Sequence, residues 1–508
     1  MKYFSLLLFL LAISCEKPIT APVASVPTPV PAVSIDSDQI KSSVVRVNST
    51  QQVWKPGQPW EKGPARSRRA LAVLVDRNLI LTTAEMVGDA TFIELESTDG
   101  TRHATAKVIN VDYEANLTLL GLKKPEEDKS FFDGMKPLDL ATPPDIGSKL
   151  DIVQVEENGR TLLTPGNLQS AEVISTFLPG QLFLTYQVKA AMQSSASSFC
   201  LPVLSNGKLA GILSSYDSKD QICDVIATTL VSRFLNDSKS DTYKGFPNLG
   251  VGASPTEDKA FREWLQIPDN EGGLYVSKVR KNSAADLAKI VKGDVILAID
   301  GKPIDRRGYF QDPQYGSLYW IQMVRGTKAS GDTLIIKILR EGKMIDVNVT
   351  LSRQEESTRL VPFYQFGKAP NFLVKGGMIF QELSRPLLEA YGEEWETRAP
   401  LNFLDVLSNP ESYQDKFDRV VCLTGVIPTP STVGYESLRN LIISKVNGKP
   451  IRNMKDMLDA CKKPPLGASS HRIEFLDEDL VIYLDDRTTD AVDQALLQRG
   501  LPFLSRAE

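Results

Sequence analysis

Residues 78–95, NLILTTAEMVGDATFIEL, contain two short apolar runs on either side of a polar turn. The first run is typical of a buried strand, and the residues AEM after it fit a short helical turn. Runs of the same kind recur before and after this stretch, among them VVRV, ALAVLV, AKVINV, LTLLGL, LAGILSS and CDVIATTLV. Short strands at this spacing, with turn signals between them, predict a mainly β sandwich or barrel over residues 40–238.

The length and composition are those of an ordinary globular protein. The chain has 508 residues, of which 42% are hydrophobic and 24% are charged. At about 100–200 residues per domain, this length favours about three domains. The formal net charge of −5 gives no reason to expect nucleic acid as a partner.

Residues 1–15 have the features of an export signal. Lys2 is followed by FSLLLFLLAI, an apolar run too short to span a bilayer as a permanent helix. The run ends in AISC, which resembles a bacterial lipobox with Ala12 where most lipoboxes have Leu. This resemblance implies that Cys15 is lipidated and becomes the mature N-terminus. A plain secretory signal with an incidental cysteine is the alternative.

Residues 16–39 are expected to be a tether rather than part of the fold. The segment begins EKPITAPVASVPTPVPAV, and its prolines favour extended polyproline conformers. Together with a lipidated Cys15, the tether predicts a protein held on a membrane of the bacterial cell envelope. The sequence leaves open whether this is the periplasmic face of the outer membrane or the cell surface.

The cysteines and histidines do not form a metal-binding pattern. Beyond Cys15 there are four cysteines without a CxxC pair, and the chain has only two histidines. We therefore expect no metal site and no cofactor. Cys200 and Cys223 flank a predicted hairpin, and both a disulfide and two buried free thiols remain open for them.

The order of motifs in residues 40–238 resembles the trypsin-like domain of the HtrA/Deg proteases. That family has ILTNAHVV, D-x-x-x-D-L-A-L-L and GNSGGP at intervals along the chain. This chain has LILTTAEMV, DYEANLTLL and SSFCLP in the same order. The resemblance implies a trypsin-like double β-barrel.

Each catalytic position of the family motif is changed in this chain. The histidine position falls on Glu85 and the aspartate position falls on Asn116. The serine position falls on Phe199 in an ungapped alignment, or on Ser198 after a slip of one residue. The triad needs an imidazole base, a carboxylate that orients it and an exposed hydroxyl. We therefore expect no catalytic residues here, and a domain that keeps the protease fold without hydrolysing peptide bonds.

Residues 244–353 resemble a PDZ domain of the HtrA/Deg kind. The resemblance rests on the glycine-containing loop before residue 251, on GGLYVSKV, on NSAADLA and on GDVILAIDGKPI. Such domains add an extended peptide to an edge strand and bind its C-terminal carboxylate with backbone amides. SLYWIQMV is predicted to be a helix facing this groove. The resemblance implies a binding site made of Pro247, Asn248, Leu249, Gly250, Val251, Leu318, Ile321 and Gln322.

Residues 354–508 are predicted to form a second, divergent PDZ-like domain with a C-terminal helix. VNGKPI at residues 446–451 repeats IDGKPI at residues 299–304, which fits two related domains. LVPF and GGMIFQELSRPLLEAY resemble the second PDZ domain of plant Deg proteases. Asn453 is placed to cap a helix, and HRIEFLDEDLVIYLD predicts a hairpin.

Three functions follow from this sequence. The first is a membrane-anchored pseudoprotease that binds peptide C-termini or unfolded envelope proteins through its PDZ domains, as a chaperone, adaptor or scaffold. The second is an active serine endopeptidase with a rearranged site, because a fold does not settle a function. The third is a structural or adhesin-like envelope lipoprotein. The family resemblance also implies a homo-oligomer built on trimers.

Overall fold

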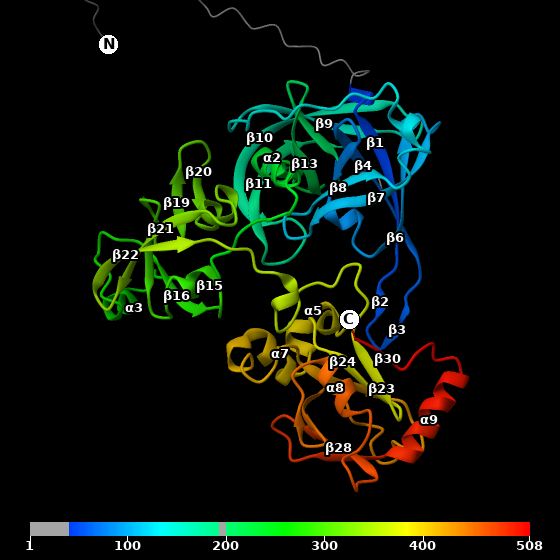
Figure 1. The fold of residues 1–508 in the computed structure, drawn as a ribbon. Helices are drawn as coiled ribbons and strands as arrows, with labels where there is room; N and C mark the ends of the chain where they lie inside the picture. Colours follow the sequence, from blue (N-terminus) through cyan, green and yellow to red (C-terminus); the bar gives the residue numbers. More distant parts are fainter. Residues whose placement is uncertain (1–39, 193–199, 508) are drawn as a thin grey trace, which may run out of the picture. The chain divides into compact units, whose positions relative to one another are not determined.

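The computed structural model describes residues 40–192 and 200–507. The signal, the tether, and Ser198 and Phe199 at the serine position of the family motif lie outside the described residues. As predicted, the fold is mainly β: it contains two closed barrels and two further large sheets (Figure 1).

The first barrel closes through six antiparallel strands. They are, in order around the barrel, β1 (Val44–Gln51), β4 (Arg66–Asp76), β5 (Leu79–Thr82), β8 (Leu117–Leu122), β7 (His103–Asp112) and β6 (Ala90–Ser97). The opening stretch behaves as predicted, since β5 leads into a single 3-10 turn, η1 (Ala84–Met86). Val45, Ala72 and Leu95 are among the side chains that fill the barrel interior. A separate hairpin, β2 (Trp54–Lys55) and β3 (Gln58–Lys62), lies between β1 and β4 in the sequence.

The second barrel has the same construction. Its strands are β10 (Thr161–Ser175), β11 (Leu182–Ala190), β14 (Ile222–Ala227), β13 (Lys208–Asp217), β12 (Pro202–Ser205) and β9 (Lys149–Val155). A 3-10 turn, η2 (Lys129–Phe132), precedes this barrel in the sequence, and α2 (Thr228–Asp237) follows it. The predicted strand at LAGILSS lies in β13, and the first five residues of CDVIATTLV lie in β14, its antiparallel partner. The strand prediction is wrong for the last four residues, TTLV, which begin α2.

The first PDZ-like sheet runs in the order β15-β16-β17-β21-β22, with β18 paired to β17. Its strands are β15 (Val251–Pro255), β16 (Leu274–Val279), β17 (Val295–Ile299), β18 (Lys302–Pro303), β21 (Thr333–Arg340) and β22 (Lys343–Thr350). The short helices are α3 (Lys259–Trp264) and α4 (Ala284–Leu287). Ser283 caps α4 by accepting a hydrogen bond from the amide of Asp286, because a helix start leaves such amides without a partner.

The helix predicted for SLYWIQMV is wrong in its first half. Leu318 lies on β20 (Gly316–Tyr319), which forms a hairpin with β19 (Tyr309–Asp312). Only after Ile321 does the chain turn into η3 (Gln322–Gly326), a short π-helical segment. Gly316 has φ +75°, a conformation that glycine adopts without steric cost, so the chain turns sharply where a helix was expected to begin.

The second PDZ-like sheet has the order β29-β28-β26-β25-β24-β23-β30, with β27 paired to β26. Its strands are β23 (Phe372–Lys375), β24 (Met378–Glu382), β25 (Val421–Val426), β26 (Leu441–Val446), β27 (Lys449–Pro450), β28 (Ser470–Phe475), β29 (Val481–Asp485) and β30 (Ser505–Arg506). The helices are α5 (Arg385–Glu389), α6 (Trp395–Arg398), α7 (Leu401–Ser408), α8 (Met454–Ala460) and α9 (Asp486–Gln498), with 3-10 turns η4 (Glu356–Thr358) and η5 (Pro410–Ser412). The predicted cap at Asn453, the closing hairpin and the C-terminal helix are all present.

The sequence repeat corresponds to a structural repeat. Asp300 and Gly301 turn β17 into β18 with φ of +46° and +76°, and Asn447 and Gly448 turn β26 into β27 with φ of +55° and +78°. Two successive residues at positive φ are what a two-residue hairpin turn requires. The two halves of the repeat therefore form the same turn in the two sheets.

Candidate functional site

The positions of the base and of its orienting partner lie next to each other in the first barrel. Glu85, in the turn after β5, donates its backbone amide to Oδ1 of Asn116 at 3.1 Å. Asn116 is fully buried and has φ +55°. Two residues that are 31 positions apart in the sequence, and that the motif alignment puts at these two positions, are therefore in contact. What meets there is a carboxylate and an amide rather than an imidazole and a carboxylate.

The carboxylate of Glu85 already has a cationic partner. Nη2 of Arg68, on β4, lies 2.9 Å from Oε2 of Glu85, and the Glu85 side chain is 14% exposed. A guanidinium at this distance occupies an acceptor that a general base would need free. Sequence reasoning missed Arg68; its only signal was the basic run RSRR that opens β4.

Cys200 lies beside this pair but is not an activated nucleophile. It is fully buried in the core of the first barrel, and its Sγ lies 2.7 Å from Oγ1 of Thr83. Burial raises the pKa of the Cys200 thiol to about 12, and the charge of Glu85 adds to this effect. Reactive cysteines need the opposite environment, which favours the thiolate. Cys200 also has φ +58°, a left-handed conformation that glycine adopts more readily than cysteine.

The structure has Cys200 and Cys223 as buried free thiols, which is the second of the two alternatives. Cys200 packs in the first barrel, whereas Cys223 lies on β14 of the second barrel, opposite Tyr216 and Val188. Because they lie in different barrels, no disulfide joins them.

The two histidines make their contacts elsewhere. His103 begins β7 with its side chain half exposed, and its Nδ1 lies 3.6 Å from Oε1 of Glu94. His471 is buried in the second PDZ-like sheet, with Asn447 at 3.0 Å and Asp486 at 3.2 Å. Within the residues that the structure describes, no contact brings an imidazole to Glu85.

The loop before Asn116 is fixed by arginines of the first PDZ-like region. Arg325 of η3 forms a buried ion pair with Glu114 and donates to Oε1 of Gln181 at 2.7 Å. Nη1 of Arg353 lies 3.4 Å from Oδ2 of Asp112. Removing one partner from such a buried pair is strongly destabilising, so this loop is rigidly held.

The predicted carboxylate-binding loop has the expected backbone geometry. Gly250 has φ +81°, and a Cβ at this position would lie 2.2 Å from Cβ of Ser283. The backbone amide of Gly250 donates to Oδ1 of Asn248 at 2.7 Å, and the amide of Asn248 donates to the carbonyl of Ser352 at 2.9 Å. Pro247 and Leu249 are buried, and Val251 begins the edge strand β15. One loop amide is therefore already bonded to a side-chain oxygen of the same loop.

The predicted groove residues do not share one helix. Leu318 is 1% exposed on β20, Ile321 precedes η3, and Gln322 is its first residue. Gln322 is 7% exposed, and its buried Oε1 has no hydrogen-bond partner. Leu318 is therefore better described as a core residue, whereas Gln322 keeps an unused acceptor.

In the second PDZ-like sheet the strand that corresponds to β15 is β24, and its outer edge is covered by β23 and then β30 of the same chain. β30 pairs antiparallel with β23, so that Leu373 lies opposite Ser505 and Phe372 lies opposite Arg506. The amide of Val374 donates to the carbonyl of Leu504 at 2.7 Å. Sequence reasoning missed this strand, because two residues are too few to show any periodicity.

Comparisons with known proteins agree with this architecture. Models of the PDZ domain match residues 247–351 and 361–501. Protease Do-like 2 of Arabidopsis thaliana, a chloroplast protein, is 30% identical over 474 residues, covering 91% of this chain and 74% of its own length. Putative protease Do-like 3 from mitochondria of the same plant is 25% identical over 470 residues, with coverage of 91% and 78%.

Among solved structures, the HtrA-type protease AlgW with a decapeptide superposes with a TM-score of 0.47 at 18% identity, covering 64% of this chain and 99% of that one. The identity and coverage shared with protease Do-like 2, together with both PDZ matches, place this chain in the HtrA/Deg family of trypsin-like, Do-like serine proteases with two PDZ domains.

Proposed function

We propose that this member of the family is a pseudoprotease that binds peptide C-termini or unfolded envelope proteins through its first PDZ domain. Its role is that of a chaperone, adaptor or scaffold. The observation that carries the proposal is the pair of Glu85 and Asn116 at the positions of the base and its orienting partner. Proton abstraction from a hydroxyl near neutral pH needs a free base with a pKa near the working pH, and Glu85 is engaged by Arg68.

Peptide binding by the first PDZ domain is supported by its edge strand. β15 is the outermost strand of its sheet, and among the described residues no strand pairs with its outer edge. A peptide that adds to β15 would gain main-chain hydrogen bonds, and its carboxylate would meet the amides of the loop at Gly250. Asn248 competes for one of these amides, so the proposal predicts modest affinity.

Anchoring is the second part of the proposal. Lipidation of Cys15 and the tether at residues 16–39 would hold the folded part on a membrane of the bacterial cell envelope. None of the helices described between residues 40 and 507 is long and apolar enough to cross a membrane. Metabolic labelling with an alkyne fatty acid, compared with a Cys15→Ser variant, tests this part. Light scattering tests the trimer-based oligomer that the family resemblance implies.

A fluorophosphonate probe applied to the purified protein tests the loss of catalysis. We expect no covalent labelling and no hydrolysis of casein, with an active family member labelled in parallel as the positive control. The second candidate function is an active endopeptidase with a rearranged site, which is favoured by relatives that are named proteases. Labelling of one hydroxyl that a Ser198→Ala substitution abolishes would establish this candidate and refute the proposal.

Binding is tested separately by fluorescence anisotropy with peptides that end in an apolar residue. A peptide with a free C-terminal carboxylate is expected to bind, and the same peptide as an amide is expected to bind at least about tenfold more weakly. Equal binding of both forms would favour a structural or adhesin-like lipoprotein whose PDZ folds do not recognise C-termini.

A further inference from the structure

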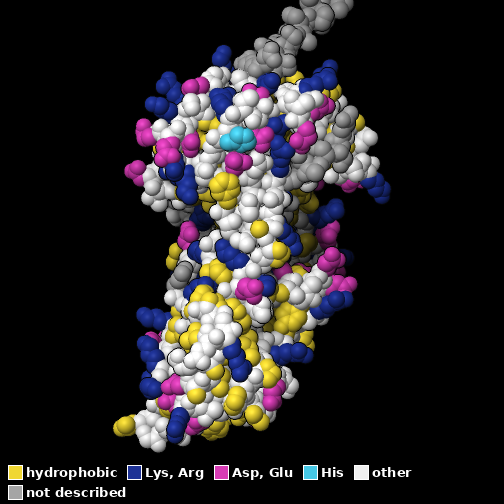
Figure 2. Space-filling view, turned by 90° about the vertical axis from the view of Figure 1, so that its right-hand side faces the viewer, with side chains coloured by type: hydrophobic (Ala, Val, Ile, Leu, Met, Phe, Trp, Pro, Cys, Tyr) yellow, Lys and Arg dark blue, Asp and Glu magenta, His cyan; other side chains and the backbone are white. Residues whose placement is uncertain are grey.

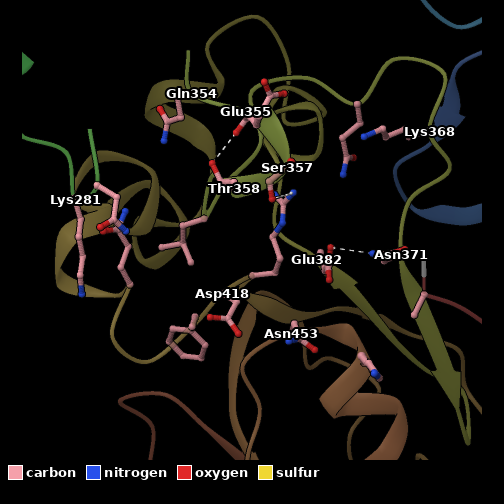
Figure 3. Close-up of a pocket in the computed structure, with 18 of the residues that line it drawn as sticks. Lys281, Gln354, Glu355, Ser357, Thr358, Lys368, Asn371, Glu382, Asp418 and Asn453 are labelled. Atoms are coloured by element: carbon pink, nitrogen blue, oxygen red, sulfur yellow. Dashed lines mark hydrogen bonds between the residues drawn. The ribbon is translucent and has the colours of Figure 1, made fainter. Parts of the chain in front are cut away.

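A large polar cavity extends from the loop at Gly250, and most of its lining has no role in the proposed binding of a C-terminus. Its volume is about 1120 Å³. Most of the lining comes from three parts of the chain: residues 248–283 of the first PDZ domain, the segment 352–371, and residues 382–462 of the second PDZ domain; Ala507 completes it. Figure 3 shows side chains from all three parts, including Lys281, Lys368 and Asp418, surrounding one open space.

The lining is more basic than the protein as a whole. The chain carries a net charge of −5, and Figure 2 shows Lys and Arg interspersed with Asp and Glu over one face of the molecule. The cavity instead has seven basic side chains against four acidic ones. The basic ones are Arg280, Lys281, Arg353, Lys368, Arg419, Lys455 and Lys462, and the acidic ones are Glu355, Glu382, Asp418 and Asp459.

Most of the acidic side chains are already engaged. Asp418 lies 2.8 Å from Nη2 of Arg452, and Asp459 lies 2.6 Å from Nζ of Lys462. Glu382 accepts hydrogen bonds from Nδ2 of Asn371 at 3.1 Å and from the amide of Met454 at 3.2 Å. These three carboxylates therefore already form ion pairs or hydrogen bonds with residues in the cavity wall or next to it.

Four of the seven basic side chains have no carboxylate partner in an ion pair within the described residues. Lys281 and Arg353 are paired with Asp415 and Asp112, and Lys462 with Asp459. The remaining four form no ion pair with any carboxylate in the described part of the chain: Arg280, Lys368, Arg419 and Lys455. The cavity therefore carries an excess of positive charge that the fold itself does not neutralise.

Two of these four are arginines with an unused donor. Nη1 of Arg280 and Nη1 of Arg419 are each buried without a hydrogen-bond partner. Burial lowers the pKa of Arg280 to about 10, with the neighbouring Arg359 as the second cause, and burial also lowers the pKa of Arg419. A guanidinium that has lost water without gaining a partner destabilises the fold, and an anion bound nearby would offset this.

We propose that this cavity binds an acidic segment of a polypeptide, whose Asp or Glu side chains pair with Arg280, Arg419, Lys368 and Lys455. A peptide fits the lining better than a phosphate, because amides and apolar side chains such as Gln354, Leu360 and Phe417 alternate with the charges. The acidic residues of the wall would also repel the dense charge of a phosphate more than that of spaced carboxylates. The site shares Asn248 and Gly250 with the carboxylate-binding loop, but it recognises side-chain carboxylates and does not require a free C-terminus.

The test uses the full chain and a pair of dye-labelled peptides, hexaglutamate and hexaglutamine, both acetylated and amidated. We expect hexaglutamate to bind at least about tenfold more tightly than hexaglutamine in anisotropy titrations. The preference should weaken between about 50 mM and about 500 mM salt, because salt screens exposed charges. Replacing both arginines, Arg280→Gln with Arg419→Gln, should remove the preference.

A matched control removes the same charge elsewhere. Lys259→Gln with Arg398→Gln changes two exposed side chains outside the cavity, and it should leave hexaglutamate binding unchanged. Urea unfolding of each variant verifies that it is folded. Equal binding of both peptides to the wild-type chain, or tight binding that survives in the folded arginine variant, would overturn the proposal. So would tripolyphosphate that binds through the two arginines when hexaglutamate does not. Because both peptides are amidated, these outcomes are independent of C-terminus recognition at β15.

Discussion

The two PDZ domains differ at the strand that a peptide ligand would extend. In the first, β15 is the outermost strand, and among the described residues no strand pairs with its outer edge. In the second, β24 takes the place of β15, and β23 and then β30 of the same chain continue the sheet beyond it in antiparallel register. Unpaired edges attract additional strands. The comparison shows that one fold can leave its backbone donors and acceptors open in one copy and pair them internally in the other.

β30 is stabilised by side-chain contacts in addition to its backbone hydrogen bonds. The rings of Phe503 and Phe372 lie 5.6 Å apart, and Leu504 packs in the same apolar cluster. The guanidinium of Arg506 lies 4.6 Å from the ring of Trp54 and 4.7 Å from that of Phe503. Such cation–π contacts add to the area that the two apolar residues bury.

Removing residues 501–508 should have the largest effect on this comparison. The deletion removes three partly buried apolar side chains that pack on one cluster, Leu501, Phe503 and Leu504, and together they should contribute about as much as one fully buried aromatic side chain, about 3 kcal/mol. We expect a loss of at least this size in the free energy of unfolding, measured in urea. Leu401→Ala, at a side chain that is 82% exposed, serves as the control and should change stability by less than about 0.5 kcal/mol.

The same deletion should convert the second domain into a strand acceptor. The synthetic peptide LPFLSRA, which repeats residues 501–507, should bind the shortened chain and restore part of its stability, whereas the full chain should not bind it. If the shortened chain is as stable as the full one, or does not bind this peptide, β30 does not cover an edge that can accept another strand.

Gly250→Ala should reduce the difference between the two PDZ domains by blocking the peptide-binding loop of the first. The new Cβ would lie 2.2 Å from that of Ser283, in a residue with φ +81°. We expect the loop to shift and the affinity for a free-acid peptide to fall at least about tenfold, as measured by anisotropy. Gly301→Ala is the control: φ is +76° there, but nothing lies within 4 Å of the new Cβ. It should cost about 1 kcal/mol of stability while binding is retained.

Local sequence signals predicted most of this fold. The alternation in the strands and the Asp-Gly and Asn-Gly turns at residues 300 and 447 depend on near neighbours, and all of them are present. SLYWIQMV failed because its apolar spacing fits both a helix and a hairpin, and Gly316 decided in favour of the hairpin. β30 could not be predicted, because its pairing joins residues 505 and 373 and depends on tertiary contacts.

The motif order indicated which residues to compare at the candidate site, but not the charges around them. Motif order alone put Glu85 beside Asn116, and the structure has them 3.1 Å apart. The partner Arg68 lies on another strand, and only the closure of the barrel brings its guanidinium to Glu85. The basic cavity likewise combines residues from distant parts of the chain, so no local window could reveal its charge.

The second PDZ domain should also respond to mild acid, whereas the first contains no histidine. Burial, followed by the charge of Lys375, lowers the pKa of His471 below its ordinary value of 6.5. Below about pH 6.5 the unfolded chain therefore binds a proton that the folded domain does not. The free energy of unfolding should decrease as the pH is lowered, by at most about 1.4 kcal/mol per pH unit. Urea unfolding between about pH 7.5 and 5.5 should show this slope. His471→Gln should remove it, and His103→Gln, at a half-exposed side chain, should not. An unchanged slope in His471→Gln would assign the effect to other groups.

The smallest expected effect concerns the first domain and its self-bonded loop. Oδ1 of Asn248 accepts the amide hydrogen of Gly250 at 2.7 Å, and a ligand carboxylate would need this same donor. Asn248→Ala frees the amide without adding bulk, so it should tighten binding of a free-acid peptide by about 0.5–1.5 kcal/mol, the usual net value of one hydrogen bond. The amidated peptide should gain nothing. Asn248→Asp is the matched variant: it keeps the acceptor and adds a negative charge next to the incoming carboxylate, so it should weaken binding below that of the wild-type chain. If the alanine variant bound both peptide forms as the wild-type chain does, the amide of Gly250 would have no part in recognising a C-terminus.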